Sequence, residues 1–380
     1  MRLRMNFSKS GQNSVFISFA VIGAALLLPY LTLSSPDELN SYDVARIAEL
    51  QHLRRTLGES VWPGFGSSEI PVAMAKGRRE YLFDHPAVPD GYVSVRLPSY
   101  PGTLMYKKGR TLPRLAMTAI PVGGIGTALM PDKTTFDQVA SLMQSDADAS
   151  SSFFSTAMRG GAIADTVVYI LVAVHESFHA FQSKQDMNRI QNRFDLPPGS
   201  LDEKEFISRL REVDATVEII NLIDAESRHL AQALSAESLS ECQNEARLFL
   251  KTRDTRRQSI FEKDRDLTVA SIASYENGIE WIEGTANYVE NRIYELASEN
   301  TYHPLKLITC VPGFDGYGKL PVSKILSLDR SAEMSSRTRS YAVGAGICSL
   351  LDRLGAEWKK SAIEELIPPA ELLKLVLEDM

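Results

Sequence analysis

The chain has 380 residues, of which 44% are hydrophobic and 23% are charged, and its formal net charge is −7. This composition is typical of a globular protein that buries one large core or two modest ones. The negative charge argues against a general nucleic-acid binder, so we expect no nucleic-acid partner.

The N-terminal segment combines a basic start with a long uncharged stretch. Residues 1–10 carry three basic side chains, and no further charged residue appears before Asp37. Residues 11–35 are long enough to cross a bilayer as a helix of about 20 residues. Because basic residues precede this stretch and acidic residues follow it, the pattern predicts a cytoplasmic tail, a single-pass membrane anchor and an extracytoplasmic (periplasmic or extracellular) remainder.

Two alternatives exist for residues 11–35. A cleaved signal peptide is one, but the apolar run is longer than a usual signal core and lacks an A-x-A end. A buried globular helix is the other, and it would leave the basic flank unexplained. The uncleaved anchor is therefore the favoured interpretation.

The next two regions differ in sequence pattern. Residues 36–60 have helical spacing that ends near Gly58, and they predict a helical linker. In residues 61–131, prolines and glycines separate short β-branched or aromatic pieces, which predicts a small β-rich subdomain with an antiparallel sheet. Its stretch "VGGIGTALM" is faintly similar to a dinucleotide-binding fingerprint, but the third glycine is missing and Pro131 follows. A glycine-rich turn or edge strand is the favoured interpretation.

Residues 132–380 have helical periodicity almost throughout, so the whole chain is predicted to be α+β and mostly α-helical. The basic run "KTRDTRRQSIFEKDRD" is interpreted as a solvated helical face. The cysteines Cys242, Cys310 and Cys348 form no C-x-x-C pair, which leaves one disulfide or buried free thiols open. Helices are expected at 134–145, 151–185, 201–236, 237–263, 264–298, 331–355 and 369–378.

The stretch "YILVAVHESFHAFQSKQ" carries the residues that point to chemistry. His175, Glu176 and His179 form an H-E-x-x-H motif within an apolar helical segment. Residues four apart lie on one face of a helix, so both imidazoles can reach one zinc ion. Glu176 lies about 100° round the helix from His175, where it can address a water on the metal without binding the metal. A pair of satisfied core histidines is the structural alternative.

A catalytic zinc also needs a third protein ligand. The metzincin continuation is excluded, because Gln182 and Gln185 occupy the positions of its glycine and histidine. Polar residues at alternating steps of four and three in "SYENGIEWIEGTANYVENRIYELAS" predict one acidic stripe on one helical face. Burying this stripe requires a cation, which zinc would supply; a solvent-facing stripe is the alternative. Its members are Glu276, Glu280, Glu283, Asn287 and Glu290.

The stretches "HESFHAFQ" and "WIEGTANYVE" together resemble the gluzincin metallopeptidases, the group that includes thermolysin and aminopeptidase N-like enzymes. In aminopeptidase N-like enzymes, the glutamate before the glycine of the second motif binds zinc, and that position here is Glu283. The resemblance thus implies His175, His179 and Glu283 as zinc ligands and Glu176 as the base. It implies a helical metallopeptidase-like domain over 132–380.

Two features of the chain differ from aminopeptidase N-like enzymes. The interval between His179 and Glu283 holds helices of its own, so residues of about 201–263 are interpreted as a helical insertion. No "G-A-M-E-N" motif precedes the histidines, so aminopeptidase specificity does not carry over. The same pair of motifs is similar to that of uncharacterised membrane-linked bacterial proteins.

The expected mechanism is zinc-dependent hydrolysis of a peptide or protein substrate. Glu176 would accept a proton from the attacking water and deliver it to the leaving amine. Gluzincins often use a tyrosine or histidine as oxyanion donor, and Tyr341 is the candidate, with an ordinary core tyrosine as its alternative. Asn287 and Glu280 are candidates for orienting the histidines.

Two other functions remain open at this stage. One is a catalytically inactive, membrane-tethered scaffold with a structural or vestigial zinc site. The other is a zinc hydrolase that acts on other amides or esters. Glu176 separates the scaffold from the enzymes, because a structural zinc site has no need of a carboxylate beside its first ligand.

Overall fold

The computed structural model describes residues 38–109, 111–144, 166–185, 187–197, 199–299, 301–318 and 328–380. The expected cytoplasmic tail and anchor, residues 1–35, lie outside the described residues, as does the first part of the helix expected at 151–185. None of the helices in the described ranges is long and apolar enough to cross a membrane.

The first part of the chain forms a six-stranded sheet with the strand order β3–β4–β2–β1–β6–β5. The expected antiparallel arrangement holds for every pairing except β1 with β6, which run parallel with Val72 opposite Ala128, so the sheet is mixed. Strand β1 is buried along its whole length, as is usual for strands with parallel neighbours. The strands are β1 (Val72–Lys76), β2 (Arg79–Phe83), β3 (Val93–Val95), β4 (Leu104–Lys108), β5 (Thr118–Val122) and β6 (Ile125–Pro131).

The glycine-rich stretch "VGGIGTALM" is a hairpin turn followed by strand β6. Val122 pairs with Ile125, so the turn between them has two residues. Both of these, Gly123 and Gly124, have positive φ angles of 54° and 81°. Two successive residues at positive φ are the requirement of a type I′ hairpin turn, which explains the glycine pair. The interpretation as a glycine-rich turn is confirmed, whereas the alternative of an edge strand is wrong, because β6 lies between β1 and β5.

The remainder is mostly helical, so the fold is α+β, as expected. A π-helical turn, η4 (Glu280–Gly284), joins α9 to α10, and short 3₁₀ turns are η5 (Ile308–Cys310) and η7 (Leu328–Glu333). The α-helices are α1 (Ser41–Val61), α2 (Lys133–Gln144), α4 (Thr166–Gln182), α5 (Met187–Phe194), α6 (Glu203–Asp214), α7 (Val217–Ser235), α8 (Leu239–Lys263), α9 (Val269–Ile279), α10 (Thr285–Ala297), α11 (Ser336–Arg353), α12 (Lys359–Glu364) and α13 (Pro369–Asp379).

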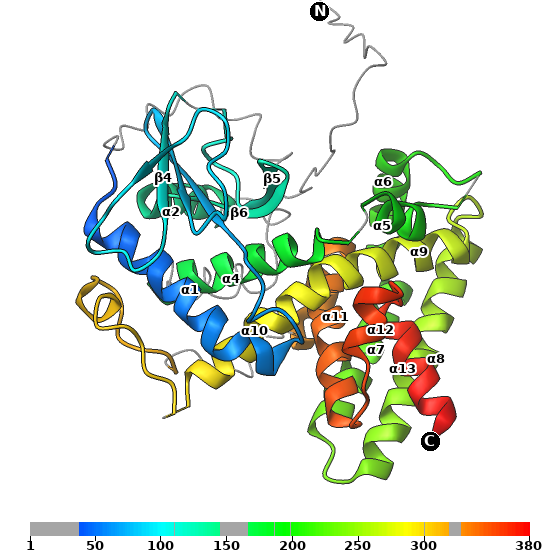
Figure 1. Ribbon diagram of the computed structural model, residues 1–380. Helices are drawn as coiled ribbons and strands as arrows, with labels where there is room; N and C mark the ends of the chain where they lie inside the picture. Colours follow the sequence, from blue (N-terminus) through cyan, green and yellow to red (C-terminus); the bar gives the residue numbers. More distant parts are fainter. Residues whose placement is uncertain are drawn as a thin grey trace, which may run out of the picture.

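Helix α4 lies at the centre of the molecule, with the sheet on one side and the helices α7, α8, α11 and α13 gathered on the other (Figure 1). It packs against β5 and β6 and also against α1 and α10. Its first half, Thr166–Val174, is buried and mostly apolar, and it packs within the main core. In the region expected to be a helical linker, α1 contributes Ile47, Leu50 and Leu53 to the same core.

The expected insertion consists of α6, α7 and α8. The single helix expected at 201–236 is two helices, because the chain turns at Ala215 and Thr216 between α6 and α7. The side chain of Asp202 caps α6 by accepting a 3.1 Å hydrogen bond from the backbone N–H of Glu205. A second apolar cluster, which includes Phe206 and Ile223 of these helices, also includes Tyr341 of α11. The insertion therefore packs against the helix that carries the expected oxyanion donor.

Candidate metal centre

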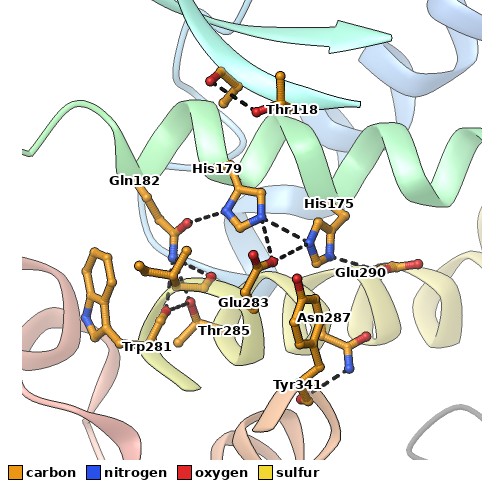
Figure 2. Close-up of polar contacts among 12 residues, drawn as sticks. Thr118, His175, His179, Gln182, Trp281, Glu283, Thr285, Asn287, Glu290 and Tyr341 are labelled. Carbon is orange, nitrogen blue, oxygen red and sulfur yellow. Dashed lines mark hydrogen bonds and ion pairs between the residues drawn. The ribbon is translucent and has the colours of Figure 1, made fainter. Parts of the chain in front are cut away.

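Helix α4 presents the two histidines of the H-E-x-x-H motif to α10. The Nε2 atoms of His175 and His179 lie 3.0 Å apart, as the four-residue helical spacing predicts. Both side chains lie between α4 and the helix below it (Figure 2). Both are also largely buried, with side chains 12% and 10% exposed, so their polar atoms need partners from other elements.

The third member of the site is Glu283, which comes from the π-helical turn. Its Oε2 atom lies 3.3 Å from the Nε2 of His175 and 3.1 Å from the Nε2 of His179 (Figure 2). One ligand atom from each of the three residues lies within 4.8 Å of the others, so together they could hold a metal ion. The structure thus brings together the three residues expected to bind metal, from two helices more than a hundred residues apart.

The prediction of one continuous acidic stripe is wrong. The backbone N–H of Thr285 donates to the carbonyl of Glu280, a five-residue spacing that marks the π-turn. This turn inserts one residue into the helix, so side chains before and after it face different partners. Glu276 and Glu280 face α8, whereas Glu283 and Glu290 face α4.

The partners of Glu276 and Glu280 correct a second expectation. Arg253 and Arg256, in the run expected to be solvated, are only 2% and 1% exposed. Arg253 binds Glu280, and Arg256 lies 2.8 Å from Glu276. The arginines point inward because carboxylates of α9 and η4 neutralise them, a pairing that the local sequence does not reveal.

The outer nitrogens of the two imidazoles have partners that the sequence analysis did not identify. His175 Nδ1 lies 3.1 Å from a carboxylate oxygen of Glu290, and His179 Nδ1 lies 2.8 Å from the amide oxygen of Gln182. The expected orienting residues have other roles, since Glu280 binds Arg253 and Asn287 donates to the backbone carbonyl of Tyr341. The polarity of Gln182, three residues after His179 on an apolar helix, was the available signal.

Tyr341, the expected oxyanion donor, lies beside His175. Its ring is parallel to that of His175, with the two centroids 6.3 Å apart. Arg337, one turn earlier on α11, places Nη2 3.3 Å from the Tyr341 hydroxyl and 2.9 Å from Oε1 of Glu283. Burial raises the pKa of Tyr341 well above its usual value, so its hydroxyl stays protonated and able to donate. Arg337 was not anticipated.

The close contacts between imidazoles and carboxylates shift the pKa values of the site residues. Burial alone lowers the pKa of His175, but its hydrogen bonds to the carboxylates of Glu283 and Glu290 raise that pKa to about 10. Burial alone raises the pKa of Glu283, yet the nearby His179 and the imidazole hydrogen bonds hold it well below its usual range. Without a metal, a proton therefore supplies the positive charge that these carboxylates require.

Glu176 differs from the other acidic residues of the site. Its side chain is buried, and its Oε2 atom has no hydrogen-bond partner within the described ranges of the chain. Burial is the main cause that raises the pKa of this carboxyl group. A buried carboxylate with one unpartnered oxygen, near three converging ligand atoms, is costly as structure and suited to accepting a proton.

The chain matches no protein-family model, no curated protein and no solved structure. The similarity to gluzincins therefore rests on the two sequence motifs alone. The geometry described above is independent of that similarity, since it follows from how α4, η4 and α10 pack.

Proposed function

We propose that this protein is a zinc metallopeptidase of the gluzincin type, with His175, His179 and Glu283 as zinc ligands. The convergence of these three ligand atoms carries the proposal. Two histidines and one carboxylate are a ligand set of catalytic zinc sites. Ligand atoms at about 2.0–2.1 Å from a tetrahedral zinc ion lie about 3.3 Å apart. The corresponding separations here, 3.0, 3.1 and 3.3 Å, are close to that spacing.

The residues around the ligands would have different roles in hydrolysis. Bound zinc would lower the pKa of a coordinated water toward about 7 and polarise the substrate carbonyl. Glu176 accepts the proton of the attacking water and passes it to the leaving amine, and its raised pKa suits both steps. The hydroxyl of Tyr341 donates to the developing oxyanion, and Arg337 adds positive charge beside that hydroxyl.

The substitution Glu176→Gln tests this proposal. It keeps the size of the side chain and removes the basic carboxylate, so we expect hydrolysis to fall by about 10²–10⁴-fold. Zinc content and the thermal unfolding midpoint should stay near those of the wild type, because Glu176 is not a ligand. The assay uses a broad peptide library and simple esters, with chelator inhibition and zinc rescue. Glu364→Gln, on the exposed surface of α12, is the matched control.

Two results would contradict the proposal in different ways. Full activity in Glu176→Gln would mean that the hydrolysis comes from another source. Zinc-loaded wild-type protein without activity on any peptide or ester would favour the inactive, membrane-tethered scaffold. Activity on esters alone would favour a hydrolase of another class.

We also propose that residues 11–35 anchor the protein in a membrane by one pass, with the metal site on the extracytoplasmic side. The support is the basic start followed by a long uncharged stretch. Deletion of residues 1–35 should move the protein from the membrane fraction to the supernatant. Retention of the truncated protein on membranes after a high-salt wash would contradict a single anchor.

A further inference from the structure

A cluster of buried ion pairs lies between the insertion and the helix that carries Glu283. We call it the arginine–glutamate cluster. Its members are buried side chains of α7, α8, α9 and η4 that pair in a network of opposite charges. They are Arg253, Arg256, Arg257, Glu226, Glu276 and Glu280.

One pair of this cluster acts directly on the π-turn. Arg253 Nη2 binds Oε1 of Glu280, the first residue of η4, and lies 3.5 Å from Oε2 of Glu276, one turn earlier. Both partners of the Arg253–Glu280 pair are almost completely buried, at 2% and 0% exposure. The guanidinium of α8 therefore holds the point at which the helix leaves α-helical spacing, three residues before Glu283.

Helix α11 holds the other side of the same turn. A Cβ atom on Gly284 would lie 2.7 Å from the Cα of Gly344, and one on Gly344 would lie 3.0 Å from the Cα of Glu280. These distances leave no room for a side chain, so the two backbones are in direct contact. The π-turn is thus fixed between an arginine on one side and a glycine backbone on the other.

We propose that Arg253 is a positioning residue for the third metal ligand, acting through its ion pair with Glu280. The pair keeps η4 in the π-helical register that turns Glu283 toward His175 and His179. Relaxation to α-helical spacing would rotate Glu283 by about 100° relative to one of its flanking helices. This inference rests on the proposed function, because it assumes that Glu283 binds zinc.

The test compares zinc affinity with stability in a pair of variants. Arg253→Met alone leaves the carboxylate of Glu280 buried without its partner, so it should lower both the thermal midpoint of the metal-free protein and the zinc affinity. The double variant Arg253→Met/Glu280→Met removes both charges and should regain most of the thermal midpoint. Its zinc affinity, measured by competition with a chelator, should remain about 10-fold or more below that of the wild type.

A matched control comes from the same cluster. Arg256 and Glu226 form a pair of similar burial that joins α8 to α7 and makes no contact with Glu280, although Arg256 also lies 2.8 Å from Glu276 and Glu226 lies 3.9 Å from Arg253. The double variant Arg256→Met/Glu226→Met should shift the thermal midpoint, but it leaves the Arg253–Glu280 pair at the start of η4 in place, so the zinc affinity should stay within about 3-fold of the wild type. A loss of affinity equal to that of the first pair would overturn the proposal, because any damage to the cluster would then suffice.

Arg253→Lys keeps the charge and tests the proposal even where the methionine variants do not fold. Arg253 contacts Glu280 through Nη2, and the lysine ammonium is one bond nearer to the backbone than Nη2, so zinc affinity should fall at a near wild-type thermal midpoint. Wild-type zinc affinity in Arg253→Lys or in a stable Arg253→Met/Glu280→Met protein would show that Arg253 is merely structural. Wild-type protein that binds no zinc would instead reject the proposed function, and this inference with it.

Discussion

The helix formed by α9, η4 and α10 buries carboxylates in two halves that are neutralised in different ways. In the first half, Glu276 and Glu280 face guanidinium groups of α8, and charges of opposite sign balance within the arginine–glutamate cluster. In the second half, Glu283 and Glu290 face imidazoles of α4.

The two halves differ in the charge that they leave uncompensated. Around the histidines lie the carboxylates of Glu176, Glu283 and Glu290, and in the described part of the chain the guanidinium of Arg337 binds one of them, Glu283. If the imidazoles are neutral, as metal ligands must be, two negative charges remain. A divalent cation bound there, as we propose, would supply that charge. The first half needs no such ion, because arginine side chains of α8 neutralise its carboxylates.

Glu283→Gln should have the largest effect in the second half. The amide is a poor zinc ligand, so zinc should fall from about one ion per chain to near zero, and hydrolysis should disappear. Elemental analysis of purified protein measures the first effect. If zinc were retained in Glu283→Gln but lost in Glu276→Gln, the third ligand would lie in the first half of the helix. That result would contradict the proposed difference between the two halves.

Glu276→Gln should have the converse effect in the first half. It leaves buried guanidinium charge uncompensated, which costs about 3–5 kcal/mol of the free energy of unfolding. The pKa of Glu276 is held well below its usual range by Arg256, Arg257 and Arg253 against the opposing effect of burial, so this carboxyl is charged at neutral pH. Denaturant unfolding measures the loss. At saturating zinc, metal content should stay near one ion per chain, and a stable protein without zinc would contradict the assignment.

The response to pH also separates the halves. His175 has a pKa raised from 6.5 to about 10 in the metal-free fold. Its contribution to stability is therefore fully present below about pH 6.5 and is lost as the pH rises toward 10. The unfolding free energy of metal-free protein should fall over this window by more in the wild type than in His175→Asn. Zinc affinity should rise over the same window, because zinc replaces the proton; equal pH profiles for the two proteins would contradict the shift.

The sequence predicted those features that depend only on residues close together in the chain. The four-residue spacing of His175 and His179 requires only that α4 is helical, and Gly123 with Gly124 is a turn signal of adjacent residues. The parallel pairing of β1 with β6 joins strands far apart in the chain, and alternation of side chains along a strand does not encode it.

The π-turn could not be predicted because its causes lie in other elements. The spacing from Glu276 to Glu290 fits one face of a regular α-helix, and the extra residue is stabilised by Arg253 from α8 and Gly344 from α11. The basic run of α8 was interpreted as solvated for the same reason. The sequence shows its positive charges, but it does not show that carboxylates of α7, α9 and η4 pair with them. Glu283, which the resemblance implied as the third ligand, lies beside both histidines, whereas Glu276 and Glu280 of the expected stripe face α8.

The contacts on the outer nitrogens of the histidines determine their tautomers before any metal arrives. The amide nitrogen of Gln182 donates to acceptors of η4 and α10, which turns its oxygen toward His179. A carboxylate such as that of Glu290 accepts from His175 in the same way. Both Nδ1 atoms therefore carry hydrogen, and both Nε2 atoms face Glu283. Binding of a metal ion would then require the loss of the Nε2 proton of His175 and no exchange of tautomers.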